Sequence, residues 1–176
     1  MKYTIREERT TDYESTEAIV EEAFRGEEFS DQQEHHLVRR IRQSAEFIPE
    51  LSLVAETEGN LVGHILLSKV QIVGDTEEWE SLALAPVSIS PAYQKQGIGG
   101  ALIQEAMKRA KNLGFSSIVL LGHPAYYPKF GFVPASRFGV QSPFRVGDAY
   151  FMAVELEKDA LSNVRGTVKY PATFDE

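Results

Sequence analysis

The chain opens with a strand-like pattern that gives way to two helix-like patterns. Residues 2–7 alternate between apolar and polar side chains, as a half-buried strand does. Thr11 with Glu14, and Ser30 with Gln33, have the spacing of capping boxes, which predicts a helix opening at each pair. Apolar residues recur at helical spacing after both pairs. The first third of the chain is therefore expected to hold a strand and two helices.

The middle of the chain has the pattern of a group of strands. Residues 51–56 and 61–73 are mainly apolar runs, and turn-forming residues 58–60 between them predict a hairpin. A third strand is expected over residues 82–89. Pro86 interrupts it, and because proline cannot donate to a strand ladder, we expect a bulge or an edge at this point.

The clearest helical pattern covers about residues 97–113, where apolar side chains share one face. A short apolar strand follows at 116–121, and a late strand is predicted at 150–156. Strand, helix and strand in this order are typical of a parallel crossover. With no repeat or linker in the sequence, we expect one mixed α/β domain over residues 1–176.

Composition narrows the classes of function. The chain has 176 residues, 43% of them hydrophobic, which is enough for a sizeable core. Acidic residues outnumber basic ones by 26 to 18, which argues against binding to nucleic acid. The absence of cysteine excludes disulfides and thiolate nucleophiles. No leader pattern and no membrane span are expected, and the predicted location is the cytoplasm.

The segment from residue 87 to 102 carries the most chemical information. An apolar strand runs into a turn, and glycines stand where a helix begins. The free N–H groups at a helix start attract phosphate, and glycine lets phosphate approach the main chain closely. The P-loop pattern is absent, and Leu102 occupies the place of the third glycine of a dinucleotide fingerprint. The pattern that is present is Gln94-x-x-Gly97-x-Gly99.

This pattern resembles the acyl-CoA-binding motif of the GNAT superfamily of N-acyltransferases. Residues 84–91 are similar to the family's splayed fourth strand, and residues 127–132 to its Tyr-x-x-x-Gly-Phe segment. Residues 122–127 and 166–170 resemble a subgroup of small bacterial N-acetyltransferases. The resemblance covers nearly the whole chain. It implies a central, mostly antiparallel sheet with one parallel, splayed strand pair, flanked by helices. One departure is that the asparagine usually found just after the family's fifth strand is absent, and Gly122-His123-Pro124 stands there instead.

The resemblance also implies the reaction and its residues. The co-substrate is acetyl-CoA, no metal is involved, and the acetyl group passes directly to a primary amine. Tyr127 is the implied general acid that protonates the CoA thiolate. Main-chain groups of the strand bind the pantetheine arm, the amides of the turn hold the pyrophosphate, and polar side chains close the turn. The implied cofactor-binding residues are Val87, Ser88, Ile89, Gln94, Lys95, Gln96, Gly97, Ile98, Gly99 and Gly100.

The acceptor and the general base stay open at this point. Glu27, Glu28, Glu80 and His64 are candidates for the base, although a structural or solvated role explains each of them better. The acidic loop at 25–31 favours a cationic acceptor such as a polyamine, an aminoglycoside or a lysine-like amine. The acceptor is a small molecule or a peptide amine, and a homodimer is compatible with the sequence. The alternative function is a non-catalytic acyl-CoA sensor, or an interaction module on the same scaffold.

Overall fold

The structure, a computed structural model, describes residues 2–28 and 30–175. The predicted domain 1–176 and the loop 25–31 include positions 1, 29 and 176, which lie outside the described residues, and the single-domain organisation stays a prediction. The helices are α1 (Tyr13–Phe24), α2 (Glu34–Arg42) and α3 (Ile98–Asn112). The strands are β1 (Thr4–Glu7), β2 (Ser52–Thr57), β3 (Asn60–Val73), β4 (Glu78–Ile89), β5 (Ser117–Leu121), β6 (Val133–Pro134), β7 (Val140–Gln141), β8 (Phe151–Glu155) and β9 (Gly166–Lys169).

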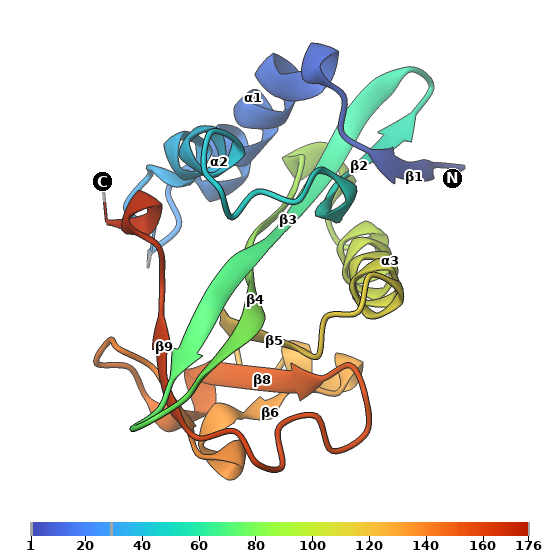
Figure 1. Cartoon of the computed structure of the whole chain (residues 1–176). Helices are drawn as coiled ribbons and strands as arrows, with labels where there is room; N and C mark the ends of the chain where they lie inside the picture. The colour runs from blue at the N-terminus through green and yellow to red at the C-terminus, as the bar shows by residue number, and fades with distance from the viewer. Residues whose placement is uncertain (1, 29, 176) are drawn as a thin grey trace.

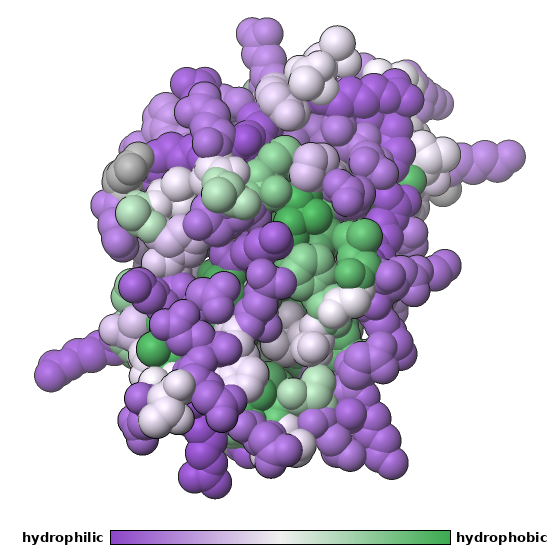
Figure 2. Space-filling model, in the orientation of Figure 1, coloured by the Kyte–Doolittle hydropathy of each residue, from purple (hydrophilic) through white to green (hydrophobic). Residues whose placement is uncertain are grey.

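The strands form one mixed sheet in the order β1-β2-β3-β4-β5-β8-β6, while β9 pairs with both β3 and β7 (Figure 1). Helix α3 covers one face of this sheet, and α1 and α2 cover the other. The alternating side chains of β3 contact both layers. Ile65 and Leu67 pack in the cluster that contains the buried face of α3. Leu66 packs instead with Val20 of α1 and Ile41 of α2. Hydrophilic side chains dominate the margins of the molecule in the same orientation, and apolar residues gather toward the middle (Figure 2).

Strand β4 leaves its parallel partner β5 after a short contact. The two strands pair only at Leu82 with Ile118 and at Ala83 with Val119. The register of β3 against β4 shifts opposite Pro86, which is the bulge that the sequence predicts. Within the described residues, β4 then continues to its end with no strand on its β5 side. The predicted fold class, a mostly antiparallel sheet with a splayed parallel pair, is confirmed; β7 and β9 add a second, two-residue parallel pairing.

The capping box predicted at Thr11 and Glu14 is wrong. Helix α1 begins only at Tyr13, after a 3-10 turn at Thr10–Asp12, and its N-cap residue Asp12 makes no side-chain bond to the helix. The Asp12 carboxylate accepts the backbone N–H of Arg9 at 2.7 Å and also pairs with Arg6 in β1. The contact of Asp12 with Arg9 therefore closes the turn before the helix, where the sequence predicted a cap at Thr11.

The box predicted at Ser30 and Gln33 is also wrong. Helix α2 begins at Glu34, and the Ser30 hydroxyl lies 2.7 and 2.6 Å from the two oxygens of the Glu34 carboxylate. The same hydroxyl accepts the backbone N–H of Gln32 at 2.9 Å. Ser30 is thus held against the first residue of the helix rather than capping its third.

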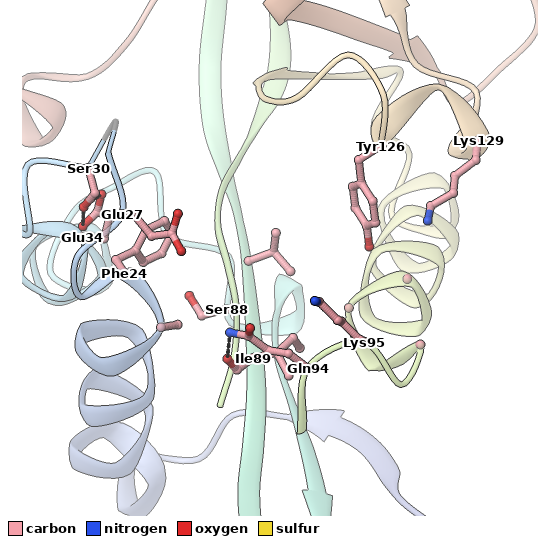
Figure 3. A pocket seen from close by; sticks show the side chains of 15 residues that line it. Phe24, Glu27, Ser30, Glu34, Ser88, Ile89, Gln94, Lys95, Tyr126 and Lys129 are labelled. Atoms are coloured by element: carbon pink, nitrogen blue, oxygen red, sulfur yellow. Dashed lines mark hydrogen bonds between the residues drawn. The ribbon is translucent and has the colours of Figure 1, made fainter. Parts of the chain in front are cut away.

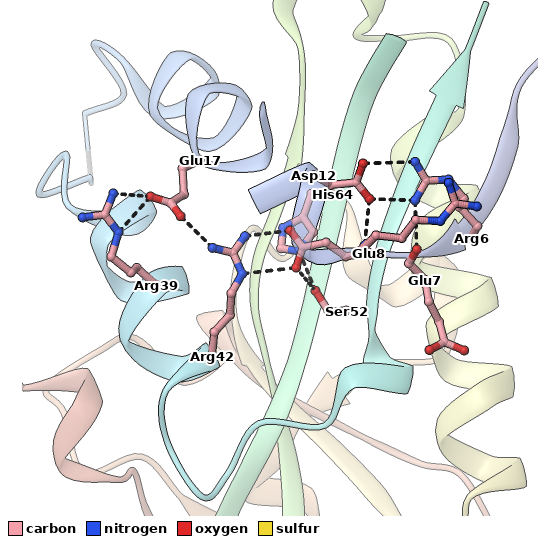
Figure 4. A network of polar contacts seen from close by, with 10 residues as sticks. Arg6, Glu7, Glu8, Asp12, Glu17, Arg39, Arg42, Ser52 and His64 are labelled. Carbon is pink, nitrogen blue, oxygen red and sulfur yellow. Dashed lines mark hydrogen bonds and ion pairs between the residues drawn. The ribbon is translucent and has the colours of Figure 1, made fainter. Parts of the chain in front are cut away.

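A polar network crosses the α1–α2 face of the sheet (Figure 4). His64 Nε2 lies 3.0 Å from Ser52 Oγ, which donates to Glu8 at 2.9 Å. Arg42 joins Glu8 to Glu17 through hydrogen bonds of 2.6 Å to each carboxylate. His64 is fully buried, and burial lowers its pKa to about 4. The imidazole is therefore neutral near pH 7. Because the Ser52 hydroxyl donates its proton to Glu8, it can only accept from His64, which assigns the imidazole proton to Nε2.

We expect His64 to make stability depend on pH. An unperturbed histidine has a pKa of 6.5, whereas His64 in the folded chain has a pKa of about 4. The unfolded chain therefore binds the proton first, so stability is complete above about pH 6.5 and is lost as the pH falls toward 4. The steepest loss is about 1 kcal/mol per pH unit. Denaturant unfolding across this window measures it. The slope should flatten in His64→Gln but persist in the control His36→Gln, and an unchanged slope in His64→Gln contradicts the assignment.

Candidate active site

A cavity of about 730 Å³ lies beside the splayed part of β4 (Figure 3). One wall comes from the end of α1, the loop after it and the first residue of α2, and carries Phe24, Glu27 and Glu34. The opposite wall comes from the glycine-rich turn before α3, together with Tyr126 and Lys129. Helices α1 and α3, which lie on opposite faces of the sheet, thus both border this cavity.

The glycine-rich turn is shaped for close approach to the main chain. Gly97 precedes α3 with a φ of 86°, a left-handed conformation that favours glycine. A Cβ at Gly97 would meet nothing within 4 Å, so the space over it is open. The Gln94 side chain closes the turn by donating to the carbonyl of Ile89 at 3.0 Å. The first amides of α3 lack partners inside the helix and carry the positive end of its dipole.

Most of the residues predicted to bind the cofactor do surround this cavity. Gln96 and Ile98 are not among its walls, and the Ile98 side chain is buried in the core beneath α3. Only the main chain of Ile98 is available to a ligand. The roles of all ten residues stay predictions. Those that line the cavity are Val87, Ser88, Ile89, Gln94, Lys95, Gly97, Gly99 and Gly100.

The two adjacent tyrosines occupy different positions. Tyr126 lines the cavity, and its hydroxyl would lie 3.4 Å from a Cβ at Gly99. Tyr127, the predicted general acid, is not among the lining residues. Its ring packs edge-on against Tyr126 at 5.0 Å and against Phe132 at 6.0 Å. Burial raises the pKa of Tyr127 to about 12 and also raises the pKa of Tyr126.

Gly122, directly after β5, leaves room for an aromatic ring. A Cβ at this position would overlap the ring of Tyr127. A glycine is therefore needed for the Tyr127 ring to lie over the end of the strand. An asparagine here would displace that ring.

The four candidates for the general base lie in different parts of the structure. Glu27 lies on the cavity wall. Glu28 does not line it, and Glu80 pairs with Gln71 toward the other end of β4. His64 belongs to the buried network described above. In the part of the chain that the structure describes, no group of three or more acidic or histidine side chains is placed to hold a metal ion.

Two charged residues on the cavity walls, Glu34 and Lys129, were not predicted from the sequence. Glu34 was not singled out because Gln33, the residue before it, was expected to complete the capping box with Ser30. Lys129 lies within the motif after β5, and its Nζ stands 4.0 Å from the centre of the Tyr126 ring. The walls consequently differ in charge: Glu27 and Glu34 face Lys95 and Lys129 across the cavity.

Residues 6–132 match the Acetyltransferase (GNAT) family. The chain is 33% identical over 123 residues to the uncharacterized N-acetyltransferase YjhQ of Escherichia coli K12, covering 69% of this chain and 68% of that protein. The structure resembles a GNAT family acetyltransferase from Brucella melitensis solved with acetyl-CoA (TM-score 0.81, 35% identity, 99% of each chain covered). It also resembles Escherichia coli YhbS solved with CoA (TM-score 0.89, 26% identity, 100% of this chain and 93% of that one). The chain belongs to the GNAT family of acetyltransferases.

Proposed function

We propose that the chain binds acetyl-CoA in this cavity and transfers the acetyl group directly to a primary amine. The observation that carries the proposal is that the splay between β4 and β5 and the glycine-rich start of α3 share one hollow. The unpaired edge of β4 offers main-chain groups to the amides of a pantetheine arm. The α3 N-terminus, with Lys95 and Lys129 nearby, suits a pyrophosphate. The CoA and acetyl-CoA bound to the two solved relatives support this assignment.

The transfer follows a direct displacement. A primary ammonium with a pKa near 10.4 first loses a proton to solvent or to a cavity carboxylate. The neutral nitrogen then attacks the thioester carbonyl carbon, and a C–N bond forms. The nitrogen, now positively charged, loses a further proton to solvent as the C–S bond breaks. CoA leaves as a thiolate and takes up a proton, so the products are an N-acetyl amine and free CoA thiol. Donors aimed at the carbonyl oxygen stabilise its charge in the transition state.

Tyr127 is the general acid in this proposal. A pKa of about 12 keeps its hydroxyl protonated at neutral pH, as a proton donor requires. Tyr126 is a second candidate because it is the tyrosine that lines the cavity. Single phenylalanine variants of the two residues distinguish them, as set out in the Discussion.

Release of the CoA thiol over a panel of amines, with acetyl-CoA fixed, tests the proposed function. We expect thiol release that depends on the amine, together with a rise in melting temperature when acetyl-CoA is added. A rise in melting temperature without thiol release for any amine would favour the acyl-CoA sensor. If acetyl-CoA does not raise the melting temperature and no amine gives thiol release, the chain is an interaction module that has lost cofactor binding.

A further inference from the structure

The wall formed by α1 and α2 presents two carboxylates that have no cation of their own. Neither Glu27 nor Glu34 forms an ion pair within residues 2–28 and 30–175, whereas Glu17 and Glu21 of α1 are paired. Glu34 is partly buried, and its contact with Ser30 holds it in place. A fixed, unpaired carboxylate on a cavity wall is suited to a positively charged ligand.

Ser88 adds an independent sign of a ligand on this side of the cavity. The neighbouring side chains of Val87 and Ile89 pack toward the cluster beneath α3, so Ser88 faces the opposite way, toward α1. Its side chain is only 2% exposed, and its hydroxyl has no hydrogen-bond partner among the described residues. Figure 3 shows that hydroxyl directed toward Phe24 and Glu27. Buried polar groups are nearly always hydrogen-bonded, so this one calls for a partner.

The charges of the cavity assign its two sides to different molecules. Lys95, Lys129 and the start of α3 favour the anionic donor, which leaves the acidic wall for the acceptor. Phe24 stands on that wall beside the two carboxylates. An acceptor that fits this wall has a second positively charged group at a distance from the reacting amine. An apolar segment connects the reacting amine to that group.

We propose that the acceptor is a small aliphatic diamine or polyamine. Glu27 and Glu34 hold the distal ammonium, the carbon chain lies against Phe24, and the Ser88 hydroxyl accepts a hydrogen bond from the reacting amine. The inference rests on the proposed function, and it specifies which primary amines the site selects.

A matched pair of substrates tests the selection. Cadaverine carries two amino groups, pentylamine lacks the second one, and aminopentanol replaces it with a neutral hydroxyl. We expect kcat/KM for cadaverine to exceed that for either analogue by about tenfold or more, since only cadaverine can form the distal ion pair. Equal values for the three amines, or turnover of peptide amines only, would overturn the inference and leave the proposed function intact. No thiol release with any amine would overturn both.

The variants Glu27→Gln and Glu34→Gln test the anchor. Each should bring the ratio of kcat/KM for cadaverine over pentylamine closer to one, without changing the Kd for acetyl-CoA. Glu28→Gln removes the same charge from an exposed neighbour that does not line the cavity, and should leave the ratio as it is in the unaltered protein. If both variants kept the full ratio while folded and binding acetyl-CoA, the distal charge would be recognised elsewhere and the inference would fail.

Ser88→Ala separates binding from structure. Removing a buried hydroxyl that has no partner should leave the melting temperature unchanged or higher. We expect KM for cadaverine to rise about tenfold at the same time, because the amine loses an acceptor. A lower melting temperature with unchanged KM would show that Ser88 has a purely structural role.

Discussion

Replacing Gly99 with glutamate is expected to abolish measurable binding of acetyl-CoA. A Cβ at Gly99 would lie 3.4 Å from the Tyr126 hydroxyl and 3.6 Å from Ile89 Cγ1, so any longer side chain must enter the cavity. The carboxylate would then stand where the pyrophosphate is expected, and like charges repel. We expect the Kd to rise by at least about 100-fold, equivalent to about 2.7 kcal/mol of binding free energy. Isothermal titration calorimetry measures the change.

Gln104→Glu is the matched control. It adds the same charge to the same helix, at an exposed position outside the cavity. The Kd of this variant should stay close to that of the unaltered protein. Tight binding of acetyl-CoA to a folded Gly99→Glu variant would show that the donor does not use this turn.

Tyr127→Phe is expected to lower kcat by about 100-fold or more while the Kd for acetyl-CoA changes little. The ring packing against Tyr126 and Phe132 is retained by phenylalanine, so only the proton donor is lost. General acid catalysis contributes about 10²–10⁴ in rate, which sets the size of the effect. Steady-state thiol release at saturating acetyl-CoA gives kcat.

Tyr126→Phe decides between the two tyrosines. If Tyr127 donates the proton, the Tyr126 variant should keep most of its kcat. A large loss in Tyr126→Phe with little change in Tyr127→Phe would move the role to the residue on the cavity wall. Normal turnover in both variants would remove tyrosine from the acid role altogether.

The donor side of the site could be predicted because it is encoded locally. The spacing of Gln94, Gly97 and Gly99 determines a turn and a helix start over a few residues, and Pro86 disrupts a ladder at its own position. These features depend on the backbone properties of glycine and proline, which are the same in every fold. The short strands β6, β7 and β9 had no comparable pattern and were not anticipated.

The acceptor side could not be predicted in the same way because it depends on contacts between distant segments. Ser30 was expected to cap a helix, but Glu34 provides a stronger, charged partner for its hydroxyl. Ser88 was expected to contact the cofactor together with Val87 and Ile89, and only the packing of these two neighbours beneath α3 shows that the Ser88 side chain faces α1. The positions of the two tyrosines could not be predicted either: the Tyr127 ring packs over Gly122, 5 residues earlier in the chain, while Tyr126 lines the cavity.

Amide hydrogen exchange with and without acetyl-CoA tests the central claim most directly. The amides at the start of α3 lack helical partners, so they exchange readily until a pyrophosphate bonds them. We predict that acetyl-CoA slows exchange in the segment 94–100 and along the unpaired part of β4, and leaves β1 unaffected. Slowed exchange confined to other segments, with no change at 94–100, would contradict the assignment of this cavity to the acetyl donor.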